Sequence, residues 1–302
     1  MDWIDRVYGQ VCTDDSGVLE IIETSTFARL KGVRQAGPSA LAFPFKDVTR
    51  HEHSLGVYAL LRRLGASRLE QVAGLLHDVS HTAFSHAVDF VFASDEQDHH
   101  EHLKPLMLER PDLARAIAGM GFESSAFLDD SVYPMLEQPL PRLCADRLDY
   151  FLRDGMACGV VSPDFAADVL ASLTVVEGRM ALTRRDVATE AAARFATMNR
   201  IWWASATEGF IYNEFAQALR EGFRLGVIDR DDLMTEDELV LAKLDAAGSP
   251  LIAARLASIR EFRPECLANY RPLVRPKERW LDPDVVEDGH ARPLSTLENR
   301  PS

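Results

Sequence analysis

The chain has 302 residues, of which 47% are hydrophobic and 26% charged, and these are ordinary values for a globular protein. They exclude a disordered chain, a collagen-like fibre and a disulfide scaffold. The formal charge of −14 argues against general nucleic-acid binding, which depends on surplus lysine and arginine, so any phosphate must be met by a local group of cations. The length fits about two domains or one large helical domain.

The ends and the cysteines indicate the compartment. Residues 1–6 do not start a signal peptide, and no apolar run approaches the ~20 residues that cross a bilayer. The four cysteines are scattered and form no CxxC pair, which is typical of free thiols in a reducing environment. We therefore expect a cytoplasmic protein with no membrane partner.

Apolar residues at helical spacing predict the first half of the secondary structure. A loop is expected over 32–48, because this stretch contains Gly37, Pro38 and Pro44. Apolar positions three and four residues apart then predict a helix that ends near His77. Residues 142–153 show the same period and predict a second helix.

The second half contains one break in the helical pattern. Residues 173–182 carry β-formers on either side of Glu177-Gly178, which predicts one short hairpin. Thr183, with Asp186 three residues on, is typical of a capping box at the start of a long helix. Further helices are expected over 210–225 and 236–244. The predicted class is therefore all-α with one β-hairpin, as a single domain over 1–245 and then a C-terminal helix and a Pro-rich extended tail over 246–302.

Eight of the nine histidines lie between residues 51 and 102: His51, His53, His77, His81, His86, His99, His100 and His102. Neutral imidazole is a common ligand for divalent metals and a proton donor near neutral pH. His77 and His81 are four residues apart and share a helix face. His77 and Asp78 can reach one ion only at the edge or end of a helix, since neighbours point about 100° apart. The cluster indicates a surface that faces a metal or a phosphate, although His51 is expected to point away from it.

Carboxylates for a mixed nitrogen and oxygen site come from the helix over 142–153 and its continuation. Asp146, Tyr150 and Asp154 are spaced four apart and share one face. Asp149 and Arg153 share another face, where they are expected to form an ordinary i,i+4 ion pair.

These segments together resemble the HD-domain phosphohydrolases, in the branch of the deoxynucleoside triphosphate triphosphohydrolases and the sterile-alpha-motif/HD-domain dNTPase. The resemblance covers about residues 17–245, with a metal core over about 25–160. Its blocks occur in order: FARLKGVRQ (27–35), TRHEHSLGV (49–57), LLHD followed by HTAFSH (75–86), and DRLDYFLRD (146–154).

The resemblance implies a role for individual residues. It implies that His53, His77, Asp78 and Asp146 bind one divalent metal ion, which could be Fe, Mn, Ni, Co, Zn or Mg, with a second ion possible. Catalytic roles fall to His100, His81 and Asp78, with His99 or His102 as alternatives to His100. Substrate-binding roles fall to Gln35, Arg50, His86, Arg147, Tyr150 and Asp154.

Three functions follow from this resemblance. The first is hydrolysis of nucleotides, most specifically of a dNTP to deoxynucleoside and triphosphate. Ala36 stands where the family carries a larger residue that would crowd a ribose 2′-hydroxyl, which weakens any selectivity for deoxyribose. The second is a phosphomonoesterase or phosphodiesterase that acts on another phosphorylated small molecule. The third is a sensor or scaffold without catalysis. A homo-oligomer is the expected assembly.

Overall fold

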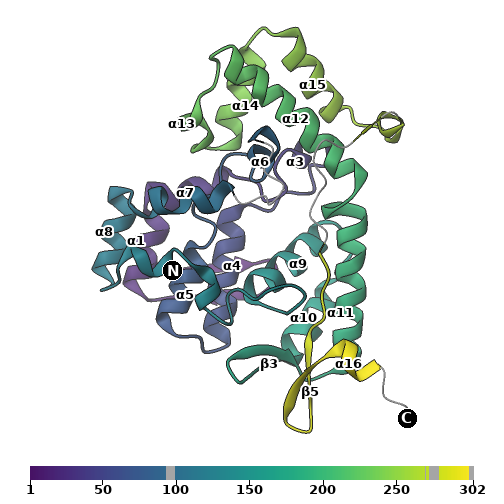
Figure 1. The fold of residues 1–302 in the computed structure, drawn as a ribbon. Helices are drawn as coiled ribbons and strands as arrows, with labels where there is room; N and C mark the ends of the chain where they lie inside the picture. Colours follow the sequence, from purple (N-terminus) through teal and green to yellow (C-terminus); the bar gives the residue numbers. More distant parts are fainter. Residues whose placement is uncertain (93–98, 269, 272–278, 299–302) are drawn as a thin grey trace.

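Helices make up most of the computed structural model, which describes residues 1–92, 99–268, 270–271 and 279–298 (Figure 1). This confirms the predicted all-α class. None of the helices in the described segments has the length and apolar composition needed to span a membrane. The helices of the first half are α1 (Ser16–Glu23), α2 (Ser25–Ala28), η1 (Arg29–Gly32), α3 (Ser39–Ala42), α4 (Arg50–Arg63), α5 (Arg68–Leu76), α6 (Ala87–Phe92), α7 (His99–Leu108), α8 (Pro111–Gly119), η2 (Ser124–Phe127) and η3 (Asp130–Val132).

The helices of the second half run along one side of the molecule and across its top in Figure 1. They are α9 (Ala145–Ala157), α10 (Pro163–Ser172), α11 (Arg185–Met198), η4 (Asn199–Trp203), α12 (Ala206–Arg224), α13 (Arg230–Leu233), α14 (Asp237–Ala246), α15 (Pro250–Arg260), η5 (Pro264–Leu267) and α16 (Leu294–Glu298). The predicted capping box is wrong, because α11 begins two residues after Thr183, whose hydroxyl instead donates to the carbonyl of Ser172.

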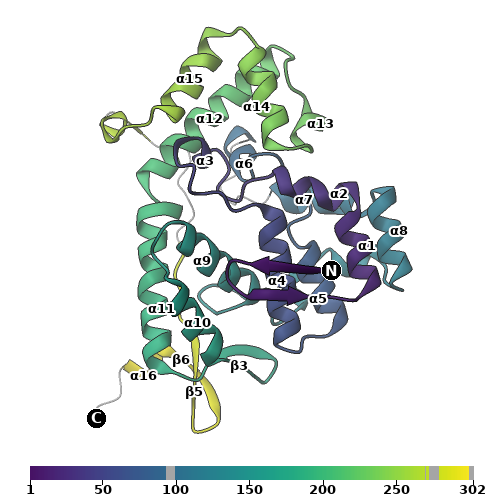
Figure 2. The same ribbon diagram turned by 180° about the vertical axis from the view of Figure 1, so that it is seen from behind.

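Helix α4 lies at the centre of the N-terminal half and packs against both α5 and α9 (Figure 2). Side-chain caps fix where two of these helices begin, because Thr49 accepts from the amide of Glu52 and Ser67 accepts from that of Glu70. Gly56 allows the close approach of α9, since a Cβ at this position would overlap the carboxylate and guanidinium of Asp149 and Arg153.

The buried apolar side chains form two clusters. The larger cluster joins α4, α5 and α9 to α11 and the C-terminal segment. The smaller one joins α12 to α6, α14 and α15. Tyr150 packs against the first cluster and Tyr212 belongs to the second, and both side chains line the cavity described below.

The predicted hairpin is confirmed as β3 (Leu173–Val176) and β4 (Arg179–Leu182), and it is joined by strands that were not predicted. β5 (Asp284–Glu287) pairs parallel with β4 and antiparallel with β6 (His290–Pro293), so the sheet has the order β3-β4-β5-β6. A separate hairpin near the N-terminus joins β1 (Asp2–Asp5) to β2 (Gly9–Cys12). The described part of the Pro-rich segment is therefore not only an extended tail but an edge of a sheet.

Candidate metal centre

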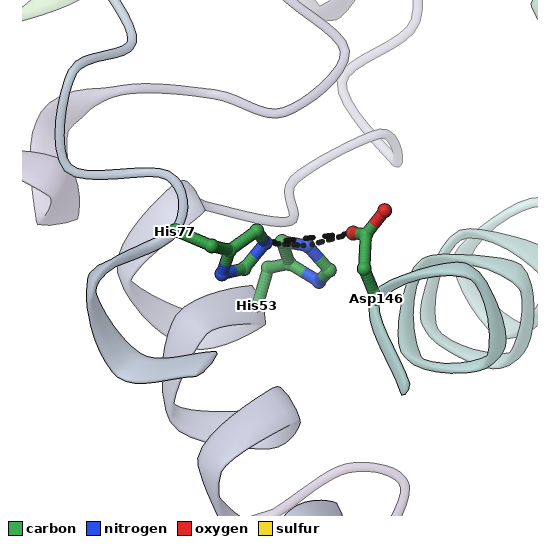
Figure 3. Close-up of side chains that lie close together, drawn as sticks. All are labelled: His53, His77 and Asp146. Atoms are coloured by element: carbon green, nitrogen blue, oxygen red, sulfur yellow. Dashed lines mark hydrogen bonds and ion pairs between the residues drawn. The ribbon is translucent and has the colours of Figure 1, made fainter. Parts of the chain in front are cut away.

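Three of the candidate ligands point toward one another from three different elements (Figure 3). His53 comes from the first turns of α4, His77 caps the C-terminus of α5, and Asp146 lies in the first turn of α9. The two Nε2 atoms of the histidines are 3.1 Å apart. Oδ1 of Asp146 lies 3.0 Å from Nε2 of His53 and 3.4 Å from that of His77. These atoms form a group that could hold a metal ion.

Both histidines are oriented by the ring nitrogen that faces away from this group. Nδ1 of His77 donates to the carbonyl of Gly74 at 2.8 Å, and Nδ1 of His53 donates to Oδ2 of Asp149 at 2.7 Å. These bonds turn the Nε2 atoms toward Asp146. Metal-binding histidines usually donate their second ring N–H to a carboxylate or a carbonyl in this way.

Asp149 is itself held by a buried arginine. The predicted ion pair with Arg153 is confirmed, with distances of 2.8 and 2.9 Å. The guanidinium of Arg153 is fully buried and also donates to Asp5 and Glu52. The pair therefore does more than join two turns of a helix, because its carboxylate orients a candidate metal ligand.

Asp78 lies beside the same two imidazoles. Its carboxylate oxygens are 3.7 Å from Nε2 of His53 and 3.6 Å from Nε2 of His77. Burial would raise the pKa of Asp78, but the charges of Arg50 and His77 and the hydrogen bond from His81 hold it well below its usual value. Asp78 is therefore a carboxylate and stands where a fourth ligand is expected.

This donor set fits a divalent cation. Burial would lower the pKa of His53, but hydrogen bonds to Asp146 and Asp149 outweigh burial and raise it to about 10. The carboxylates thus stabilise positive charge between the Nε2 atoms, whether a proton or a metal ion carries it. Two imidazole nitrogens and two carboxylates suit Mn, Fe, Co, Ni or Zn and leave coordination positions open.

Arg50 and two further histidines lie next to the candidate ligands. Nη1 of Arg50 donates to Asp78 at 2.7 Å, and its Nε donates to the hydroxyl of Ser85 at 3.0 Å. Nε2 of His81 is 3.1 Å from Asp78, and its ring meets that of His86 edge-on at 4.9 Å. Burial and the charge of Arg50 lower the pKa of His81 to about 3, so this imidazole is neutral at physiological pH.

A cavity of about 730 Å³ opens above this cluster. Its wall contains every substrate-binding and metal-binding candidate from the sequence: Gln35, Arg50, His53, His77, Asp78, His81, His86, Asp146, Arg147, Tyr150 and Asp154. The side chain of His100, the proposed catalytic residue, lies outside the described residues, as does that of His99, while His102 is exposed. Helix α7, which begins at His99, contributes Glu101 and Lys104 to the wall.

The far side of the cavity is aromatic and contains a fixed carboxylate. Asp154 accepts from Nε2 of Gln35 at 3.2 Å and from the indole of Trp203 at 3.0 Å. Trp203 also meets Tyr150 edge-on, with ring centroids 5.2 Å apart. Sequence reasoning did not place Trp203 in the site, because nothing in its spacing shows that it faces Asp154.

Arg147 also lines the cavity, but its donors are engaged by its own loop. The guanidinium donates to the carbonyl of Gln138 at 3.1 Å and to Glu137 at 3.3 Å. Burial is the main cause that raises the pKa of Glu137 to about 7, and the charge of Asp146 adds to it. Arg147 therefore stabilises the loop that precedes α9.

Asp237 of α14 holds two loops of the site together, and sequence reasoning did not single it out. Its carboxylate accepts from the amide of Phe84 at 2.6 Å and from that of Arg34 at 2.9 Å. Phe84 and Ser85 have positive φ angles of 60° and 52°, which are strained for residues other than glycine. Ser85 in turn donates to the carbonyl of Arg34 and accepts from Arg50.

Replacing Asp237 with alanine should therefore lower both stability and activity. Two buried amides lose their acceptor, at about 1–3 kcal/mol each, so we expect a loss on the order of 2–5 kcal/mol in the free energy of unfolding. Misplacement of Ser85 and Arg50 should also lower kcat/KM by roughly tenfold. Urea unfolding and steady-state kinetics measure both quantities. The control is Glu238→Ala, the exposed neighbour of equal charge on the same helix, which should change neither.

Comparison with known proteins points to the same part of the chain. The protein-family model of the HD domain matches residues 50–154, which carry all four candidate ligands. The chain is 38% identical over 299 residues to the protein YdhJ of Bacillus subtilis, covering 95% of this chain and 89% of YdhJ. It is 30% identical over 300 residues to the metal-dependent phosphohydrolase Cns2 of Cordyceps militaris, covering 96% and 86% of the two chains. A shorter match, 30% identical over 122 residues, covers 34% of this chain and 24% of the deoxynucleoside triphosphate triphosphohydrolase SAMHD1 homolog of Dictyostelium discoideum.

Proposed function

Because this chain belongs to the HD-domain metal-dependent phosphohydrolases, we propose that it hydrolyses nucleotides, and most specifically a dNTP to deoxynucleoside and triphosphate. The observation that carries the proposal is the shared cavity, in which the candidate metal ligands face a pocket formed by Gln35, Tyr150 and Asp154. The amide and carboxylate of this pocket can hydrogen-bond a sugar hydroxyl, and its aromatic rings can pack against the sugar or the base. The partial match to the Dictyostelium protein supports triphosphate substrates.

The protein's own residues would bind and orient the substrate. Held by His53, His77, Asp78 and Asp146, a divalent ion would lower the pKa of a bound water and neutralise phosphate charge. Arg50 lies beside the candidate metal ligands. It can donate to a phosphate oxygen as negative charge develops on the phosphate in the transition state. His81 is buried and His86 is half-buried, and desolvation is the main cause that lowers the pKa of each. They can therefore donate as neutral imidazoles without adding charge.

The reaction we propose is an in-line displacement at the α-phosphorus. Water adds its oxygen to this phosphorus, the bond from phosphorus to the 5′-oxygen breaks, and the 5′-oxygen takes a proton from an acid on α7. By resemblance to the family this acid is His100. General acid catalysis of this kind is typically worth ~10²–10⁴-fold in rate.

A panel of nucleotides and phosphoesters tests this proposal. Metal-loaded protein is incubated with dNTPs, NTPs, nucleoside monophosphates and simple phosphoesters, and the products are separated by ion-exchange chromatography. Release of intact triphosphate from dNTPs supports the proposal. Release of single phosphates alone would contradict it and favour a phosphomonoesterase. An Asp146→Ala preparation, purified in the same way, controls for contaminating phosphatases.

The arrangement of charges predicts one metal ion per chain. A second ion at His81 and His86 would lie close to the guanidinium of Arg50, whose positive charge already depresses the pKa values of both histidines. We therefore expect elemental analysis of the metal-loaded protein to give about one equivalent of divalent metal per chain. A value near two would show that Arg50 moves away or that these histidines bind metal despite it.

A further inference from the structure

Among the residues that the structure describes, the cavity wall holds more acidic than basic side chains. Its carboxylates are Asp78, Glu101, Asp129, Asp130, Glu137, Asp146, Asp154 and Glu208, and its lysines and arginines are Lys46, Arg50, Lys104, Arg147 and Arg279. An anionic substrate is repelled by such a wall, except where a positive charge is available to it.

Of the five cationic side chains in the described part of this wall, four are already paired. Lys46 lies 2.9 Å from Glu208, Arg50 lies 2.7 Å from Asp78, Lys104 lies 2.5 Å from Asp130, and Arg147 lies 3.3 Å from Glu137. Over the part of the chain that the structure describes, Arg279 has no carboxylate within ion-pair distance. Among the described cations of the wall, Arg279 is thus the one whose charge is not already balanced by a carboxylate.

The backbone around Arg279 is fastened to both sides of the cavity. The amide of Arg279 donates to the side chain of Asn199 in η4 at 2.9 Å. Three residues later, the amide of Asp282 donates to the carbonyl of Pro141, in the loop before α9, at 2.8 Å. The chain then enters β5 beside β4, and Figures 1 and 2 show this segment passing close to α9 and α11. The guanidinium is therefore presented from an anchored position.

The charge of Arg279 acts on three other side chains of the cavity wall. Burial and Arg50 are stronger causes of the lowered pKa of His86, and Arg279 adds to them. Burial raises the pKa of Tyr150 and of Tyr212, and in both cases the charge of Arg279 opposes it. These three side chains line the same cavity as Arg279.

We propose that Arg279 binds an anionic group of the substrate that lies beyond the phosphate held at the metal, namely a further phosphate of a polyphosphate chain. This inference rests on the proposed function and names the residue that distinguishes polyphosphate from monophosphate substrates. A guanidinium suits this task because its planar donors match two phosphate oxygens at once. Its charge, unlike that of the four paired cations, is not offset by a carboxylate of the described wall.

Binding of two inorganic probes tests the proposal without relying on turnover. The 302-residue protein, in buffer of constant free Mn²⁺, is titrated with tripolyphosphate and with inorganic phosphate by calorimetry. The variants are Arg279→Gln and, as a control, Arg271→Gln, which removes the same charge from an exposed position of the same segment outside the cavity. Melting temperatures establish that each variant is folded. The Arg279→Lys variant tests whether a positive charge without the planar guanidinium group is sufficient to bind tripolyphosphate.

We expect Arg279→Gln to weaken tripolyphosphate binding by about 10–100-fold, as for the loss of charge-assisted hydrogen bonds, and phosphate binding by less than twofold. Arg271→Gln should leave both within twofold. Tripolyphosphate affinity within twofold of wild type in Arg279→Gln, or an equal loss for both probes, would overturn the proposal. Hydrolysis of dATP and dAMP is scored separately, so a wild type that binds as expected but hydrolyses neither would contradict the proposed function and not this subsite.

Discussion

Replacing Asp146 with alanine is expected to remove the metal and lower kcat/KM on the order of 10³-fold or more, because a bound metal contributes several kcal/mol to the transition state. Asp146 is the carboxylate closest to both Nε2 atoms, at 3.0 and 3.4 Å. Without it the two imidazoles and Asp78 remain, and these give a weaker and less complete site. Elemental analysis and steady-state kinetics on the same preparation measure the two losses.

The control for this variant is His51→Ala. His51 is two residues from His53, but its ring packs against Phe27, with centroids 5.3 Å apart, and it does not line the cavity. Burial is the main cause that lowers its pKa to about 4, which fits a neutral side chain outside the cluster. His51→Ala should keep a full equivalent of metal and most of its activity. Equal metal loss in both variants would contradict the assignment.

Replacing Asp149 with asparagine should affect stability and metal affinity together. The guanidinium of Arg153 is fully buried, so weakening its pairing leaves an incompletely compensated charge, typically a loss of 3–5 kcal/mol in the free energy of unfolding. Loss of the carboxylate that fixes His53 should also weaken metal binding by about 10–100-fold. Unfolding is measured with EDTA present, so that lost metal does not contribute, and metal affinity is measured by competition with a chelator.

The matched control is an exposed ion pair. Asp245 and Arg260 lie 2.7 Å apart with side chains 45% and 40% exposed, and Asp245→Asn should cost about 1 kcal/mol or less. If Asp149→Asn is as mild as this control, and metal affinity is unchanged, then the buried pair does not position His53.

The sequence contains the pattern of this cluster but not its three-dimensional assembly. His77 and Asp78 were expected to reach one ion only at a helix end, and α5 does end at Leu76, so both lie at its C-terminus. Periodicity alone could not show that α4 and α9 meet, since His53 and Asp146 are 93 residues apart. That His53 and Asp146 share a site was predicted from the resemblance to the HD-domain phosphohydrolases, in which these motifs occur in the same order.

Other parts of the site depend on contacts that local spacing does not encode. The pairing of Asp149 with Arg153 was predicted from their spacing of four, but its burial and the bond to His53 were not. The C-terminal strands had a local signal that was overlooked, because Asp288 and Gly289 both have positive φ angles and form a turn favoured in hairpins. The proline residues of that region outweighed this signal and suggested a tail, and so Arg279 was not considered for the site.

Anomalous diffraction from crystals of the metal-loaded protein tests most directly whether His53, His77, Asp78 and Asp146 hold one divalent ion. We expect one strong peak per chain, with Nε2 of both histidines and an oxygen of each carboxylate at about 2.0–2.3 Å from it. A peak centred instead on His81 and His86, or no peak at these four residues in crystals that contain the metal, would contradict it.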